Sequence, residues 1–396
     1  MRMRKTILLV AALFLIHAGA SDVIAWSTRP EATELNEMIR SFKSVRFWSF
    51  WGNEVTDYLV AKFTLPVHEA ITNCIYGCSY QCREHNFQDC ASPTQRNQYA
   101  PSAVLAGARW NDNPPFVLTG TKVSDQQNCV GVTIQLPANH PECWAILFYD
   151  AQKGAIKKNL FYDGESGHAL LYRVHFGDMQ FLHSMATRDG ETADETKKKI
   201  MAWAEFTYKV SLGEIKHSAS LNQCGVDGVA DLFKKKPGWT VQMLFTWDDP
   251  TYKPYKDRNG FHDKAFRDFA FGSLLHMVQD SFSAAHAARE PQGGLSCGKL
   301  PDYENPGRIM TFHSFIRQEY KKHSAEDKDI AFREHIARNE QTQSSIADVG
   351  RVLRAYYELN RPWDEIKIYL DCVYDLADPN APAGPGDGFS EKAGLF

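Results

Sequence analysis

The sequence predicts a mainly α-helical fold, of the all-α class, with loops and small β excursions. The clearest sign is the stretch 264–286, where apolar residues recur every three or four positions, which is the spacing of one helix face. The stretches 345–359 and 363–376 have the same spacing. The chain has 396 residues, of which 43% are hydrophobic and 23% charged, so we expect a globular protein with a sizeable core.

The N-terminus has the features of a secretory signal peptide. Arg2 and Lys5 precede an apolar run over 6–20, which is shorter than the ~20 residues of a membrane-spanning helix. Small residues allow cleavage after Ala20 or after Ala25. We therefore expect a secreted or periplasmic protein, and an uncleaved anchor is the alternative.

The rest of the chain shows no internal repeat, and we expect it to form one domain of a monomer. The predicted units are a signal peptide over 1–25, a single helical domain with insertions over 26–376, and a flexible C-terminal tail over 377–396. The tail is assigned on its many Pro and Gly residues.

The first half of the domain mixes helices with irregular chain. Helical spacing runs over 30–76, and 78–120 is loop-like apart from a short helical piece before Pro114. The runs 129–136 and 143–150 are apolar or β-branched enough to predict two strands, arranged much as in a hairpin.

The middle of the chain is helical over 175–212 and rich in turn residues over 222–259, which we interpret as a surface excursion. The lysine runs at 197–199 and 234–236 are interpreted as solvated faces. Lys and Arg number 44 against 48 Asp and Glu, a net charge of −4. This balance argues against a nucleic-acid binder with a broad basic surface.

Nine cysteines in an exported chain indicate disulfides, because disulfides form in oxidising compartments. Nine is an odd number, so one cysteine remains unpaired. Cys74, Cys78, Cys82 and Cys90 are close in sequence, and their spacing allows disulfides or a metal site. The lack of Cys-x2-Cys pairs favours disulfides.

The segment GSLLHMVQDSFSAAH carries an H-x3-D-x5-H pattern formed by His276, Asp280 and His286. Residues four apart share a helix face about 6 Å apart, so His276 and Asp280 can bind one metal ion. His286 lies ten residues after His276, which on a continuous helix turns it roughly 80° away, toward a second ion. A helix-face ion pair with an unrelated histidine is the alternative.

Another His and Asp pair with the same spacing follows downstream. His323 and Asp327 are four residues apart and suit the second ion together with His286. His313 is a competing candidate, but Arg317 lies four residues beyond it and would repel a cation. We therefore prefer His323.

Three further candidates lie upstream of this pattern. His68 begins the helical stretch HEAITNCIY, Asp112 lies in the turn-like WNDNPPF, and His183 lies on an apolar helix in GDMQFLHSM. Taken singly, each could be an ordinary core, surface or turn residue.

In this order, the residues over 68–327 resemble the zinc-dependent phospholipase C family, whose all-α fold is shared with the single-strand-specific zinc nucleases. The H-x3-D-x5-H and H-x3-D segments carry the resemblance most specifically. The phrase GSLLHMVQDSFSAAH, preceded by HFGDMQFLHSM, is most similar to the larger enzymes of Gram-negative bacteria.

The resemblance implies up to three zinc ions. One would be held by Asp112, His183, His276 and Asp280. The second would be held by His286, His323 and Asp327. The third would share Asp280 with His68, and would also bind the N-terminal Trp26 of a chain cleaved after Ala25. Trp26 lies 42 positions before His68, a longer spacing than in the small family members, and a buried indole is its alternative role.

The resemblance implies hydrolysis of a phospholipid, such as phosphatidylcholine, to diacylglycerol and a phosphorylated head group. Zinc would activate water and polarise the phosphoryl oxygens, with Asp112 as general base. A single-strand-specific nuclease or nucleotidase is one alternative, and nucleic acid is the less favoured substrate. A secreted binding protein with a structural metal is another.

An enzyme acting on phospholipids must contact a membrane or lipid surface transiently. The segment 40–63 mixes aromatic residues, Trp48 and Trp51 among them, with the cations Lys43 and Arg46. This composition suits the headgroup level of a bilayer. Packing of the same rings in the core is the alternative.

Overall fold

The structure is a computed structural model that describes residues 67–77, 99–114, 141–236, 238–245, 256–257, 260–261, 263–291, 296–327, 331–332, 334–335 and 344–390. The predictions for the signal peptide, Trp26, the aromatic segment 40–63, Cys78, Cys82, Cys90 and the strand over 129–136 lie outside these residues. The final residues 391–396 lie outside them as well.

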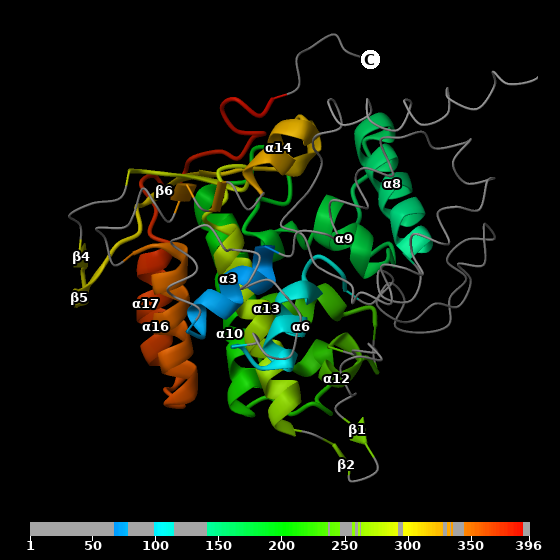
Figure 1. Cartoon of the computed structure of the whole chain (residues 1–396). Helices are drawn as coiled ribbons and strands as arrows, with labels where there is room; N and C mark the ends of the chain where they lie inside the picture. Colours follow the sequence, from blue (N-terminus) through cyan, green and yellow to red (C-terminus); the bar gives the residue numbers. More distant parts are fainter. Residues whose placement is uncertain are drawn as a thin grey trace, which may run out of the picture.

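The described fold is mainly α-helical, as predicted (Figure 1). Short strands form two-stranded antiparallel sheets that pair β1 with β2, β3 with β6, and β4 with β5. The helices are α3 (Val67–Ile75), α6 (Ser102–Trp110), α8 (Pro141–Lys158), α9 (Leu170–Phe176), α10 (Ala193–Leu212), α11 (Asp227–Ala230), α12 (Val241–Leu244), α13 (Asp263–Asp280), α14 (Tyr320–Glu326), α16 (Ile346–Glu358) and α17 (Trp363–Val373). The 3-10 turns are η2 (Gln180–His183), η3 (Leu221–Gln223), η4 (Asp231–Phe233) and η5 (Phe315–Arg317), and the strands are β1 (Lys256–Asp257), β2 (Gly260–Phe261), β3 (Ala287–Arg289), β4 (Ser296–Cys297), β5 (Leu300–Glu304) and β6 (Ile309–Phe312).

The helix α13 is central and packs against α6 and α10 (Figure 1). Two glycines bring α6 and α13 close together. A Cβ at Gly107 would overlap the carbonyl oxygen of Phe269, and a Cβ at Gly272 would overlap that of Val104. Only glycine allows this backbone approach, which places the end of α6 beside the second half of α13.

The helix α10 supplies much of the core against which α13 packs. Thr192 and Glu195 form a capping box at its start, and Gly213 ends it in the left-handed conformation. Trp203 is fully buried and stacks on Trp110 of α6, with 5.6 Å between the ring centroids. These contacts fix the relative positions of α6, α10 and α13.

The two C-terminal helices confirm the predictions for 345–359 and 363–376 and lie side by side in Figure 1. Ser345 and Asp348 form a capping box at the start of α16. A disulfide between Cys297 and Cys372 joins β4 to α17. Cys74 is also disulfide-bonded, and Cys224 is a buried free thiol. These cysteines agree with the expectation of disulfides together with an unpaired residue.

The predicted strand over 143–150 is wrong, because this run lies within α8. Phe148, Ala151 and Ala155 recur at helical spacing and pack with Tyr162 and Phe176. The helical period becomes visible only when the window extends beyond the apolar run itself.

The prediction of a surface excursion over 222–259 is wrong for its apolar residues. Val229, Phe233, Val241 and Phe245 are fully buried in the main core. The turn residues belong instead to the short elements α11, η4 and α12, of which α11 packs against α10. Lys234 is solvated, as predicted.

Residues 377–390, which the sequence assigns to the tail, form backbone hydrogen bonds to two parts of the domain. Ala383 exchanges hydrogen bonds with Gly190 and Glu191, and the Phe389 carbonyl accepts from the Glu319 amide. Pro and Gly exclude a helix here, but they do not prevent this edge pairing.

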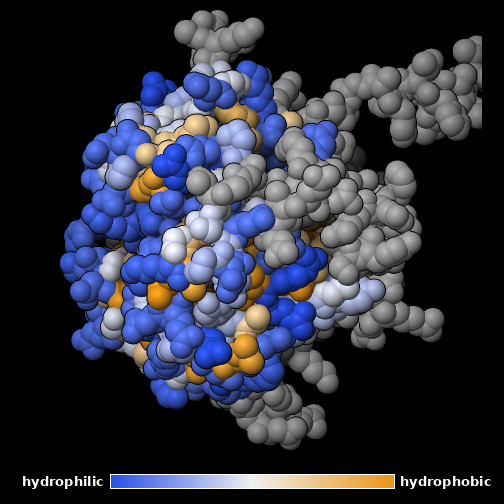
Figure 2. Space-filling model, turned by 90° about the vertical axis from the view of Figure 1, so that its left-hand side faces the viewer, coloured by the Kyte–Doolittle hydropathy of each residue, from blue (hydrophilic) through white to orange (hydrophobic). Residues whose placement is uncertain are grey.

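No helix of the described residues is long and apolar enough to cross a membrane. The face shown in Figure 2 is mostly hydrophilic over its described residues, with hydrophobic residues scattered in small groups. The disulfides are consistent with an oxidising compartment.

Candidate metal centre

The end of α13 supplies a His and Asp pair, as its spacing predicts. His276 and Asp280 are buried one turn apart, with 3.0 Å between Nε2 and Oδ2. The helix ends at Asp280 because Ser281, Phe282 and Ser283 make tighter bonds to carbonyls three residues back. His286 is therefore not on the helix, and its expected rotation along a continuous helix is wrong.

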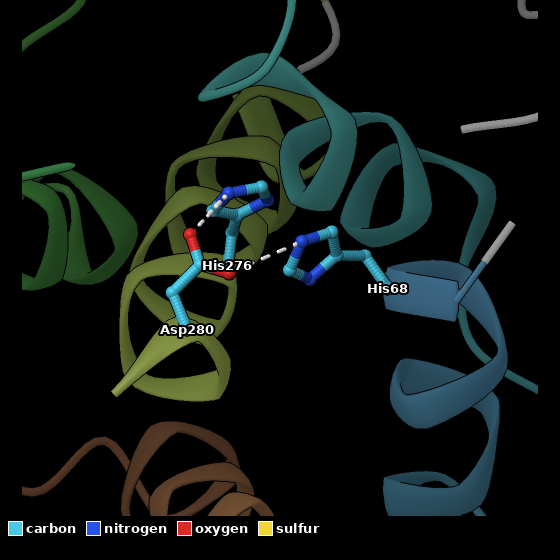
Figure 3. A group of neighbouring side chains, drawn as sticks. All are labelled: His68, His276 and Asp280. Carbon is cyan, nitrogen blue, oxygen red and sulfur yellow. Dashed lines mark ion pairs between the residues drawn. The ribbon is translucent and has the colours of Figure 1, made fainter. Parts of the chain in front are cut away.

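His68 lies beside this pair and comes from α3 (Figure 3). The helix predicted to begin at His68 is therefore confirmed. Its Nε2 lies 3.4 Å from Asp280 Oδ1, and its ring stacks on His276 with 3.7 Å between centroids. His68, His276 and Asp280 offer ligand atoms that lie within 4.8 Å of one another.

Asp112 lies in the turn after α6, where its neighbour Asn111 anchors the chain. The Asn111 amide donates to the carbonyls of Leu182 and Ser273, at 2.9 and 3.3 Å, and its Oδ1 accepts from the Ser273 hydroxyl. These bonds join the turn to η2 and α13. Asp112 is fully buried, with Oδ2 4.0 Å from His68 Nε2.

His183 lies at the end of η2, a short 3-10 helix rather than the longer apolar helix that the sequence predicts. Its Nδ1 donates to Asp280 Oδ2 at 2.8 Å, and its Nε2 is buried with no hydrogen-bond partner among the described residues. Asp112, His183 and His175 form a second group whose ligand atoms lie within 4.8 Å of one another.

His175 is a functional candidate that the sequence does not predict. It lies eight residues before His183 in HFGDMQFLH, and its ring centroid is 5.1 Å from that of His183. A nearby histidine in the same phrase was the available signal, but no spacing of a regular element linked the two.

A third group brings together His286, His323 and Asp327, as predicted. His286 Nε2 lies 3.5 Å from Asp327 Oδ1, and His323 Nε2 lies 3.1 Å from Oδ2. The Ser283 hydroxyl donates to Oδ1 at 2.6 Å. This group is close to the first, because His286 Nδ1 lies 3.7 Å from Asp280 Oδ2.

His313 belongs to none of the three groups, in agreement with the preference for His323. It is buried, and its Nδ1 lies 3.2 Å from the Ala285 carbonyl oxygen. Arg317, whose charge was expected to disfavour a cation at His313, forms an ion pair with Asp189.

Most of these histidines are oriented in the same way. Their Nδ1 atoms donate to carbonyl oxygens, which only accept, so the lone pair lies on Nε2. Metal-binding histidines are commonly held in this manner. The bonds are His68 to Gln279 Oε1 (2.7 Å), His276 to Ala108 O (2.5 Å), His286 to His183 O (2.7 Å), His323 to Gln318 Oε1 (2.6 Å) and His175 to Leu171 O (2.9 Å).

The buried carboxylates and histidines shift one another's pKa values, some upward and some downward. Burial alone would raise the pKa of Asp280, but the charges of His276, His286 and His68 hold it well below its usual value. Burial would lower the pKa of His286, but Asp327 and Asp280 raise it to about 9. Burial and the neighbouring His276 lower the pKa of His68 to about 4.

The residues present fit a metal ion. Three carboxylates and five predicted histidines are buried together, which is costly unless the charges are paired or coordinate a metal. The Nε2 of His183 has no hydrogen-bond partner among the described residues. The Nε2 atoms of four other rings lie 3.0–3.5 Å from a carboxylate oxygen, namely those of His68, His276, His286 and His323. Asp112, His175 and His183 are one such set, and the other two groups have the same composition.

Comparisons with family models, with curated proteins and with solved structures found no match for this chain.

Proposed function

We propose that this protein is a zinc-dependent phosphodiesterase of the phospholipase C type. It would hydrolyse the glycerol-side phosphodiester of phospholipids to diacylglycerol and a phosphorylated head group. The observation that carries the proposal is the cluster of three buried His and carboxylate groups in contact around Asp280.

The donor set favours zinc. Each group offers imidazole nitrogens and one carboxylate, and none of the groups found in the described residues contains a cysteine. Imidazole and carboxylate ligands suit zinc, and three protein ligands leave a position open for substrate or water. An open position is typical of catalytic zinc, whereas structural zinc has closed coordination, so this composition favours an enzyme over a binding protein.

The charge balance supports an anionic substrate. Three divalent ions would carry twice as many positive charges as the carboxylates of Asp112, Asp280 and Asp327 carry negative ones. The histidines would add no charge as neutral ligands. A loaded site would therefore be strongly positive and would attract a phosphodiester anion.

The chain's own residues would position the reactants. When bound, zinc supplies polarisation of the phosphoryl oxygens and a lowered pKa for water. Asp112, buried and fixed by the Asn111 bonds, would orient the attacking water and accept its proton. The carboxylate of Asp280, which contacts both His68 and His183, would keep their two groups next to each other.

A nuclease with the same ligands would need a cationic groove that follows a single strand. In the lysine runs at 197–199 and 234–236, five of the six side chains pair with acids, and Lys236 lies over the ring of Trp239 at 5.4 Å. The pairs are Lys197 with Asp371, Lys198 with Asp194, Lys199 with Glu191, Lys234 with Asp231 and Lys235 with Glu165.

The test is product analysis with purified protein on phosphatidylcholine and, in parallel, on single-stranded DNA, each with and without a chelator. We expect diacylglycerol and phosphocholine, lost with the chelator and restored by added zinc. Cleavage of DNA with intact phospholipid would replace this proposal with the nuclease. Bound zinc without turnover of either substrate would favour a structural metal.

A further inference from the structure

We propose that His175 is a metal ligand which, with Asp112 and His183, completes a metal site of its own beside the group of His68, His276 and Asp280. The inference rests on the metal centre of the proposed function and is independent of the substrate. It changes the grouping expected from the sequence, in which Asp112 and His183 share an ion with His276 and Asp280.

The orientation of His183 separates the two sites. Its Nδ1 is occupied by Asp280 Oδ2 at 2.8 Å and lies 3.2 Å from His276 Nε2. Its Nε2 is on the opposite side of the ring, buried and without a hydrogen bond among the described residues. A buried nitrogen without a partner destabilises the fold, and a bound ion would offset this cost. Asp112 and His175 offer ligand atoms within 4.8 Å of a ring nitrogen of His183. We assign this nitrogen as Nε2, because Nδ1 is bonded to Asp280.

His175 is held so that it can complete this set. It is the second-last residue of α9, and its Nδ1 donates to the Leu171 carbonyl one turn earlier, at 2.9 Å. The lone pair is therefore on Nε2. Phe148 of α8 packs edge-on against the ring, with 5.0 Å between centroids. The α8 helix, which the sequence did not predict, thus supports the His175 ring.

The three donors fit one zinc ion in number and kind. Two imidazoles and one carboxylate are a known catalytic set that leaves an open position. Donor atoms of one tetrahedral zinc lie about 3.4 Å apart, given bonds of about 2.0–2.2 Å. The observed separations of up to 4.8 Å would close by small side-chain rotations. The carboxylate of Asp280 then stays with His276 and His68.

The experiment is a metal count on the full-length protein. Wild type, His175→Ala and His175→Gln are dialysed against buffered free zinc, and bound zinc per chain is measured by mass spectrometry. The release rate to a chelator is followed in the same samples. Gln keeps the size and polarity of the side chain but is a poor zinc ligand, so it covers the case in which Ala perturbs folding.

We expect both variants to lose one ion per chain at the zinc concentration that saturates wild type, with affinity at one site lowered by at least about 100-fold. His183→Gln should lose the same ion. The matched control is His168→Ala, a partly exposed histidine that pairs with Asp163 outside the groups. It should bind zinc as wild type does.

Unchanged stoichiometry and release rate in both His175 variants would overturn the inference and leave the proposed function standing. Conversely, a zinc-loaded wild type that leaves phospholipid intact would contradict the proposed function. The metal count would still decide the role of His175.

Discussion

His183 Nδ1 lies 2.8 Å from Asp280 Oδ2, although 97 residues separate the two in the sequence. The same carboxylate lies 3.0 Å from His276, and its other oxygen lies 3.4 Å from His68. The carboxylate of Asp280 therefore contacts one histidine from each of α3, η2 and α13. Its removal should affect more of the centre than the loss of any one histidine.

Asp280→Asn should lower phospholipid hydrolysis by at least about 100-fold and release at least one zinc ion per chain. The Asn amide keeps the shape of the Asp side chain but removes the negative charge that stabilises several buried imidazoles and would bind the metal. Asp268→Asn, on the same helix but bonded to Lys264 and Tyr357, is the matched control and should keep its zinc. Full zinc content and full turnover in Asp280→Asn would reduce the His276 and Asp280 pair to a helix-face ion pair.

The chelator-treated protein should be most stable near pH 6.5. The folded pKa of His286 is raised from 6.5 to about 9, so its stabilisation is complete below pH 6.5 and is lost as pH rises through 9. Burial lowers the pKa values of His68 and His313 to about 4, so the unfolded chain binds more protons below pH 6.5 and stability falls toward pH 4. Melting temperatures across this range measure both limbs.

Two controls assign the alkaline limb. His286→Gln should flatten the decline between pH 6.5 and 9, and saturating zinc should do the same in wild type, because metal ligands are already deprotonated. An unchanged alkaline decline in the variant would show that another group causes it.

Removal of the disulfide should lower the free energy of unfolding without changing the zinc count. Cys297 and Cys372 close a loop with a sequence separation of 75, for which chain entropy gives about 4 kcal/mol. Urea unfolding of the Cys297→Ala/Cys372→Ala double variant tests this. Cys224→Ala removes a thiol without a cross-link and serves as control. A double variant no less stable than the control would contradict the prediction.

The parts of the site that the sequence predicts are those governed by local spacing. His276 with Asp280, and His323 with Asp327, are four residues apart, and a helical turn alone brings each pair together. Contact of His183 with Asp280 follows from no spacing. It was expected only from the order of residues that resembles the phospholipase C family.

The missed features depend on packing between distant elements. His175 reaches the site because α9 packs beside α8. The apolar run 143–150, which is part of α8, predicts a strand when it is considered alone. The approach of α6 to α13 needs Gly107 opposite Gly272, which composition does not reveal. Likewise, the Pro and Gly of 377–390 indicate irregular chain but not the backbone segments with which it pairs.

Gln318 should act as a positioning residue for His323, because its amide has only one possible orientation. Nε2 donates to the carbonyls of Ala285 and Pro385, both at 2.7 Å, so Oε1 must face His323 and accept from Nδ1 at 2.6 Å. The C-terminal segment thereby fixes the tautomer of a proposed ligand.

Gln318→Met keeps the length and the burial of this side chain but removes the amide, so His323 can turn or take the other tautomer. We expect about 10–100-fold weaker zinc binding at the group of His286, His323 and Asp327, and a shifted pH profile of hydrolysis, with little change in KM. Purely structural damage would lower the melting temperature of the chelator-treated protein and leave the pH profile in place. Gln242→Met, on α12 and away from the three groups, is the matched control for the substitution itself. Equal zinc affinity and equal pH profiles in the two variants would show that Gln318 fills space in the core and does not position His323.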